Sequence, residues 1–154
     1  MDDTWASISS GWKLVDPKKS ASESVILEGE IEDEMIIFLI LRGSRSNIIK
    51  VSNFKEQSRI FERALDSILQ DSIFQAISTN GMAVAAATED DEAVRICNKL
   101  ISKGAIAAGI SGSGPSISVV SFIQDSETIR KTLYNSGHEI IETNFIEDNS
   151  SELI

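Results

Sequence analysis

The chain has 154 residues, of which 42% are hydrophobic and 25% are charged, and its formal net charge is −10. This length suits one domain, or one domain with an appendage, and the composition argues against intrinsic disorder. The 24 acidic residues against 14 basic ones disfavour binding to nucleic acid or to anionic lipid.

Scarce residue types narrow the chemistry further. Cys97 is the one cysteine and His138 the one histidine, so an internal disulfide, a cysteine-rich zinc site and a multi-histidine metal site are excluded. The longest apolar run, Met35–Leu41, is too short to cross a bilayer, and the chain starts with acidic residues where a secretion signal would be basic. We therefore expect a cytoplasmic protein without a membrane partner, and an enzyme of this composition would use carboxylates, hydroxyls and backbone amides.

The first 30 residues differ from the remainder of the chain. A short helix is predicted between Asp3 and Ser9, and short strands are predicted at Trp12–Val15 and Val25–Leu27. A longer strand follows at Met35–Leu41, where a continuous apolar and β-branched run predicts burial on both faces.

Helices and strands then follow in an order typical of an α+β fold. Three helices are predicted at Lys55–Gln70, Ile73–Ala85 and from Asp91 to a C-cap at Gly104, then strands at Ala105–Ile110 and Ser116–Ile123, a helix at Ser126–Ser136 and a strand at His138–Thr143. From residue 31 the order β-α-α-α-β-β-α-β predicts a sandwich in which helices cover one face of a mostly antiparallel sheet.

The segment Gly109–Ser116 carries the clearest chemical signal. Three glycines and three serines in eight positions let backbone amides approach a ligand and let hydroxyls donate to it, which suits a phosphate or a polyol. The segment is neither a Walker A loop nor a complete GxGxxG motif. The alternative is a tight connection in which the glycines only permit positive φ angles.

The same segment, Gly-Ile-Ser-Gly-Ser-Gly-Pro-Ser, resembles the C-terminal glycine-rich motif of the GHMP kinases, which include galactokinases, homoserine kinases and mevalonate kinases. Residues 2–11 and 78–87 are similar to the aspartate segment and the Asn-Gly helix of archaeal-type shikimate kinases. The resemblance implies a ferredoxin-like α/β sandwich, the GHMP kinase C-terminal domain, over residues 31–154. Residues 1–30 would be the tail end of an N-terminal domain that is otherwise absent.

One family element has no match in this sequence. GHMP kinases carry an ATP-phosphate loop, Pro-x-x-x-Gly-Leu-x-Ser-Ser-Ala, before the aspartate segment, and these 154 residues do not contain it. The resemblance therefore implies the C-terminal part of a kinase that transfers the ATP γ-phosphate to a hydroxyl of shikimate, in aromatic amino-acid biosynthesis. Its implied partners are a small-molecule substrate and an N-terminal kinase half in cis or in trans, which would hold most ligands of Mg²⁺; a homo-oligomer stays open.

The resemblance also implies roles for single residues. Asp3 takes the catalytic aspartate position, where its carboxylate would accept or orient the proton of the acceptor hydroxyl. The implied substrate-binding residues are Gly109, Ser111, Gly112, Ser113, Gly114, Asn80 and Arg45.

Each of these candidates has a structural alternative. Asp3 could be a helix N-cap, and Asn80 could simply bend its helix. Arg42 and Arg45 follow the buried strand and could bind a carboxylate such as that of shikimate, although ordinary solvated arginines are the more common case.

Three function classes remain open from the sequence. The first is a kinase half, with homoserine kinase as the nearest alternative to shikimate kinase; the segment at residues 2–11 favours shikimate. The second is a non-catalytic small-molecule-binding or regulatory module with a ferredoxin-like core. The third is a structural or subunit-interaction domain.

Overall fold

The computed structural model describes residues 10–16, 18–20, 23–31, 34–44 and 49–145. The chain divides into two compact units. One unit is Met35–Thr143, and the other is made from the residues on either side of it.

The smaller unit contains an antiparallel hairpin of β1 (Trp12–Val15) and β2 (Val25–Gly29). Trp12 pairs with Gly29 across the hairpin, and a Cβ on Gly29 would lie 2.6 Å from the indole Nε1. The tryptophan ring thus packs over the glycine. Both strands expected here are confirmed, whereas the helix expected between Asp3 and Ser9 lies outside the described residues.

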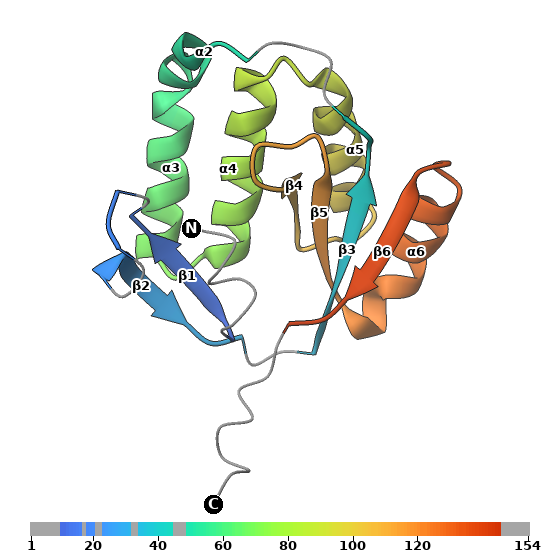
Figure 1. Ribbon diagram of the computed structural model, residues 1–154. Helices are drawn as coiled ribbons and strands as arrows, with labels where there is room; N and C mark the ends of the chain where they lie inside the picture. The colour runs from blue at the N-terminus through green and yellow to red at the C-terminus, as the bar shows by residue number, and fades with distance from the viewer. Residues whose placement is uncertain (1–9, 17, 21–22, 32–33, 45–48, 146–154) are drawn as a thin grey trace, which may run out of the picture. The chain divides into compact units, whose positions relative to one another are not determined.

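The larger unit is built on a four-stranded sheet with the order β4-β5-β3-β6 (Figure 1). These strands are β3 (Met35–Leu41), β4 (Ala107–Ile110), β5 (Ile117–Phe122) and β6 (Glu139–Thr143). Every neighbouring pair is antiparallel. The expected antiparallel sheet is confirmed, and each expected strand is present with bounds within a few residues of those predicted.

Helices make up the second layer. They are α2 (Val51–Glu56), α3 (Ser58–Leu69), α4 (Ile73–Ala87), α5 (Asp91–Ser102) and α6 (Ser126–Tyr134), the last preceded by the 3-10 turn η2 (Ile123–Asp125). The prediction of a single helix at Lys55–Gln70 is wrong, because the helical path breaks at Gln57 (φ −92°, ψ 8°) and α2 starts earlier. The rings of Phe54 and Phe61 stack 6.3 Å apart across the break, so apolar contact joins the two helices.

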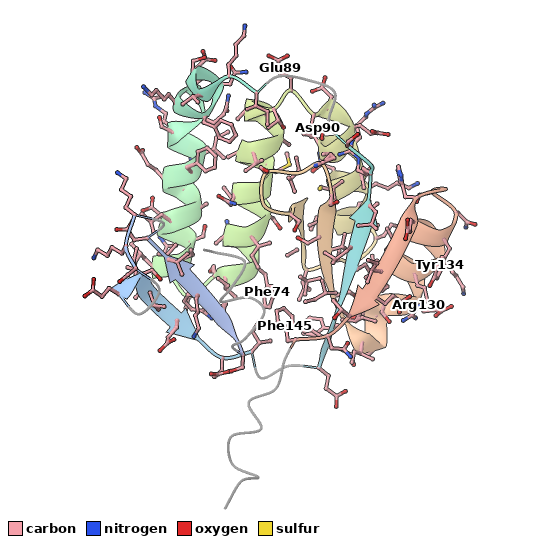
Figure 2. All side chains as sticks on the ribbon, viewed as in Figure 1. Phe74, Glu89, Asp90, Arg130, Tyr134 and Phe145 are labelled. Carbon is pink, nitrogen blue, oxygen red and sulfur yellow. The ribbon has the colours of Figure 1, made fainter. Side chains whose placement is uncertain are left out.

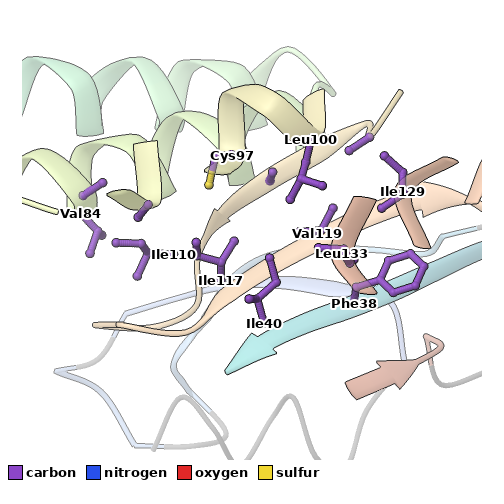
Figure 3. Packing of buried hydrophobic residues seen from close by; sticks show 14 of the residues in the cluster. Phe38, Ile40, Val84, Cys97, Leu100, Ile110, Ile117, Val119, Ile129 and Leu133 are labelled. Carbon is purple, nitrogen blue, oxygen red and sulfur yellow. The ribbon is translucent and has the colours of Figure 1, made fainter. Parts of the chain in front are cut away.

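The core lies between the sheet and these helices (Figure 3). Phe38 and Ile40 of β3 are fully buried in one cluster with residues of α5 and α6, whereas Ile37, Leu39 and Leu41 on the same strand are only half-buried. The prediction that Met35–Leu41 is buried on both faces is therefore wrong. Helices cover one face, and a strand presents alternate residues to each face, so from Ile36 to Leu41 only every second side chain is buried, although Met35 is also buried at the start of the strand.

None of the helices in the described part of the chain is both long and apolar enough to cross a membrane.

Candidate functional site

Three segments meet at one end of the four-stranded sheet. β3 and β4 are both antiparallel to β5, so their carboxyl ends lie at the same end of the sheet. Arg42 follows β3 there, and the loop Ser111–Ser116 follows β4. The connection from α4 to α5, which contains Glu89 and Asp90, reaches the same end (Figure 2).

The glycine-rich loop Ser111–Ser116 is closed by two backbone hydrogen bonds. The Ser111 N–H donates to the Ser116 carbonyl at 2.8 Å, and the Gly114 N–H donates to the Ser111 carbonyl at 2.9 Å. Gly112 and Gly114 have φ angles of 58° and 80°, a region that disfavours a side chain. Both glycines adopt positive φ, as expected if the segment is a tight connection.

The loop also leaves groups available to a ligand. A Cβ on Gly112 would meet no atom within 4 Å, so its backbone borders open space. Ser111, Gly112 and Ser113 are exposed. Such a run of accessible amides and hydroxyls can bind a phosphate or a polyol. The structure is therefore compatible with the ligand-binding interpretation as well.

Helix α4 supports the strand that leads into this loop. The Ser78 hydroxyl accepts a hydrogen bond from the Ala108 N–H at 3.2 Å. One helical turn later, Gly81 lies against Gly109 of β4, with a hypothetical Gly81 Cβ only 2.4 Å from the Gly109 Cα. Gly109 is thus buried in the sheet next to the helix. Asn80 is exposed on α4, one residue from this crossing.

Arg42 is the most highly connected side chain at this end of the sheet. Its Nη1 donates to Asp90 Oδ2 at 2.8 Å and to the Pro115 carbonyl at 3.1 Å, and its Nη2 donates to Asp90 Oδ1 at 2.9 Å and to Glu92 Oε2 at 2.6 Å. The side chains of Arg42 and Asp90 are 8% and 12% exposed. Asp90 also caps α5, since its Oδ1 accepts from the Ala93 N–H at 3.0 Å.

These bonds shift the ionisation of the groups involved. Hydrogen bonding to Asp90 is the largest cause of a raised pKa for the Arg42 guanidinium, and its bond to Glu92 lowers the pKa of that carboxyl. The expectation that Arg42 is an ordinary solvated arginine is wrong. Its guanidinium pairs with two carboxylates of this chain, Asp90 and Glu92. The sequence could not indicate these ion pairs, because the partners lie 48 and 50 residues away.

The structure thus brings some of the sequence candidates together. Ser111, Gly112, Ser113 and Gly114 form one loop, and Asn80 and Gly109 lie at the helix–strand crossing below it. Asp3 and Arg45 fall outside the described residues. Within the described ranges, no group of three or more His, Cys, Asp or Glu side chains is arranged to hold a metal ion.

A curated shikimate kinase from Methanobrevibacter smithii is similar to this chain. The two are 28% identical over 142 residues, which cover 92% of this chain and 48% of the relative. The chain therefore spans about half the length of this curated relative. No family model matches the chain.

Solved structures share the fold at low sequence identity. A phosphotransferase related to the CoA biosynthesis pathway superposes with a TM-score of 0.60 at 12% identity, covering 77% of this chain and 40% of that one. Mevalonate kinase from Methanococcus jannaschii gives 0.53 at 12% identity, covering 79% and 45%. Mevalonate pyrophosphate decarboxylase from Streptococcus pyogenes gives 0.53 at 14% identity, covering 82% and 49%.

Proposed function

We propose that this chain, which has the fold of the GHMP kinase C-terminal domain, is the C-terminal part of a kinase that phosphorylates a hydroxyl of shikimate. The observation that carries the proposal is the similarity to a shikimate kinase along 92% of the chain. The solved structures support the fold alone, so the choice of shikimate as acceptor rests on that relative. This activity would place the chain in aromatic amino-acid biosynthesis.

The glycine-rich loop would bind and orient the reactants. Phosphoryl transfer is accelerated mainly by positioning and by stabilisation of charge, which exposed amides and hydroxyls can supply. In the proposed step an acceptor hydroxyl oxygen bonds to the γ-phosphorus, the bond from that phosphorus to the ADP oxygen breaks, and Asp3 takes the hydroxyl proton. Ser111, Gly112, Ser113 and Gly114 would hold the acceptor for this step.

A further kinase half, in cis or in trans, would bind the phosphates of ATP, because this sequence contains no match to the family's ATP-phosphate loop. Among the described residues no three acidic side chains are arranged to hold a metal ion, so Mg²⁺ would be held mainly by the phosphates of ATP and by the other kinase half.

The test is release of ADP with ATP and Mg²⁺, using the protein in the form its cell of origin makes, with shikimate, homoserine or mevalonate as acceptor. The proposal predicts release that depends on shikimate. Release with another acceptor alone would contradict the choice of substrate. Binding of shikimate without any release would instead favour a non-catalytic binding module.

Asp3 is tested in the same assay. Asp3→Ala should abolish shikimate-dependent ADP release while leaving shikimate binding nearly unchanged, because the carboxylate acts on the proton rather than on affinity. Asp2→Ala is the matched control, since it removes the neighbouring acidic side chain. Equal activity of the two variants would contradict the role of Asp3.

A further inference from the structure

We propose that Arg42 is a positioning residue for the glycine-rich loop, because it fixes the carboxyl-terminal end of the loop to the first turn of α5. The inference rests on the proposed function only for the identity of the ligand. The contacts of Arg42 are independent of that function. We call Arg42, Asp90, Glu92 and the Pro115 carbonyl the Arg42 clamp.

The clamp joins three segments that are far apart in the sequence. Arg42 follows β3, Asp90 and Glu92 lie at the start of α5, and Pro115 is the last residue but one of the loop, 73 residues after Arg42. Each terminal nitrogen of the guanidinium carries two hydrogens, and each donates two of the four hydrogen bonds. Those four hydrogens are used within the chain, and the fifth, on Nε, is buried without a hydrogen-bond partner among the described residues, so Arg42 acts on a ligand through the loop rather than by direct contact.

Burial makes these contacts specific for arginine. Arg42 is paired in a two-pronged arrangement with Asp90, and both side chains are largely removed from solvent. A planar guanidinium can bond both carboxylate oxygens and a carbonyl at once, whereas a lysine ammonium is a compact point charge without this fork. Lysine at this position would keep the charge and lose the geometry.

The loop depends on the contact at Pro115 because it has few bonds of its own. Proline has no backbone N–H, so the carbonyl is the one hydrogen-bonding group that Pro115 offers. That carbonyl accepts from Arg42 at 3.1 Å. Between the ends of the loop, Gly112 borders open space and adds no packing. A loop held in its binding conformation before the ligand arrives loses less conformational entropy on binding.

The test compares Arg42→Lys with Arg130→Lys in the same chain. Arg130 is a matched control because it also makes a two-pronged contact with a carboxylate, Glu142, but on the α6 and β6 pair. We expect the amides of Ser111 and Gly114 to exchange their hydrogens about 10-fold faster in Arg42→Lys, while amides in α6 keep their wild-type rates. Arg130→Lys should leave the loop amides unchanged.

A uniform increase across the loop and α6 would indicate a general loss of stability, and loop exchange at the wild-type rate would show that Arg42 does not hold the loop. Either result overturns the proposal. If Arg42→Lys does not fold, Asp90→Asn replaces it, because asparagine can still cap α5 while the charge pair is removed. The same faster exchange confined to the loop is expected.

A second readout separates this proposal from the proposed function. Shikimate, added as the probe, should bind about 10-fold more weakly to Arg42→Lys than to the wild type and equally well to Arg130→Lys. If the wild type does not bind shikimate but loop exchange still rises in Arg42→Lys, the clamp is confirmed and the proposed function fails. If shikimate binds the wild type and Arg42→Lys equally, the positioning role is wrong and the proposed function stands.

Discussion

Gly81 of α4 and Gly109 of β4 meet backbone to backbone, without side chains between them. A Cβ on Gly109 would lie 2.9 Å from the Gly81 Cα and 3.0 Å from the Ile77 carbonyl oxygen. The close approach brings helix and strand together immediately before the glycine-rich loop begins. The position of the loop therefore depends on two glycines that do not belong to its exposed part.

Gly81→Ala is expected to destabilise the fold. The new methyl group would lie within 2.4–2.9 Å of the Gly109 backbone, which cannot move without shifting β4. Overpacking against backbone lies at the upper end of the usual range, about 3 kcal/mol, and exceeds the gain of about 1 kcal/mol in helix propensity. Urea unfolding measures the net loss. Gln75→Ala, on an exposed position of the same helix, should change stability little. Equal or greater stability of Gly81→Ala would contradict the close crossing.

Gly112→Ala should weaken ligand binding at the loop. Gly112 has φ +58° and Gly137 has φ +78°, and a Cβ at either would meet nothing within 4 Å. Alanine at each therefore carries a similar backbone strain of about 1 kcal/mol. Gly137→Ala is the matched control because it lies in the turn after α6. We expect both variants to lose similar stability and only Gly112→Ala to lose shikimate affinity. Equal affinity in the two variants would contradict a ligand site at Gly112.

Cys97 is expected to be unreactive in the folded chain. Burial raises the pKa of its thiol from 9.0 to about 11, and the residue is 3% exposed. Because the thiolate is the reactive form, a thiol reagent at pH 8 should label the folded chain at least about 100-fold more slowly than the urea-unfolded chain. The raised pKa also means that this thiol favours folding below pH 9 and that its contribution is lost between pH 9 and about 11. Comparable labelling rates in both states would contradict its burial.

Glu142 is expected to make stability sensitive to acid. Arg130 donates to both of its oxygens at 2.9 and 3.0 Å and is the main cause of its lowered pKa, and the Tyr134 hydroxyl also donates to it. Figure 2 shows Arg130 and Tyr134 on α6. A carboxyl whose pKa is lower in the folded state stabilises the fold at pH values above its ordinary pKa. This stabilisation is lost as the pH falls through the lowered pKa. Glu142→Gln should therefore be less stable than the wild type at pH 7, and the difference should vanish in strong acid.

The control for that experiment is Glu139→Gln on the same strand. Glu139 is exposed, and the substitution removes a carboxylate from the same strand while leaving the contacts of Arg130 with Glu142 in place. The measurement is urea unfolding at a series of pH values. A difference between Glu142→Gln and the wild type that is constant across the series would show that charge at Glu142 is not responsible.

Much of the fold could be predicted because its signals are local. The apolar run Met35–Leu41 is β3 to the residue, and in α6, where a helix was predicted, Ile129 and Leu133 lie four residues apart and are 0% and 2% exposed. The half-burial of Ile37 was missed because a run of consecutive apolar residues does not reveal that helices cover only one face. The break at Gln57 was missed because no proline or glycine marks it.

The candidate site was predictable only where one segment contains it. Gly112 and Gly114 signal a turn or a ligand loop from composition alone, and both do adopt positive φ. Arg42 could not be assigned in this way, since its bonds to Asp90 and Pro115 exist only once β3, the loop and α5 meet at one end of the sheet.

The most direct test of the account is a titration of the chain with shikimate, observed through the backbone amide signals of the residues that the structure describes. The account predicts changes that saturate at Ser111, Gly112, Ser113 and Gly114, with little change in α6 and none with homoserine at the same concentration. Saturating shikimate that leaves the loop signals unmoved, or that moves only signals elsewhere, would contradict the assignment of this loop as the substrate site.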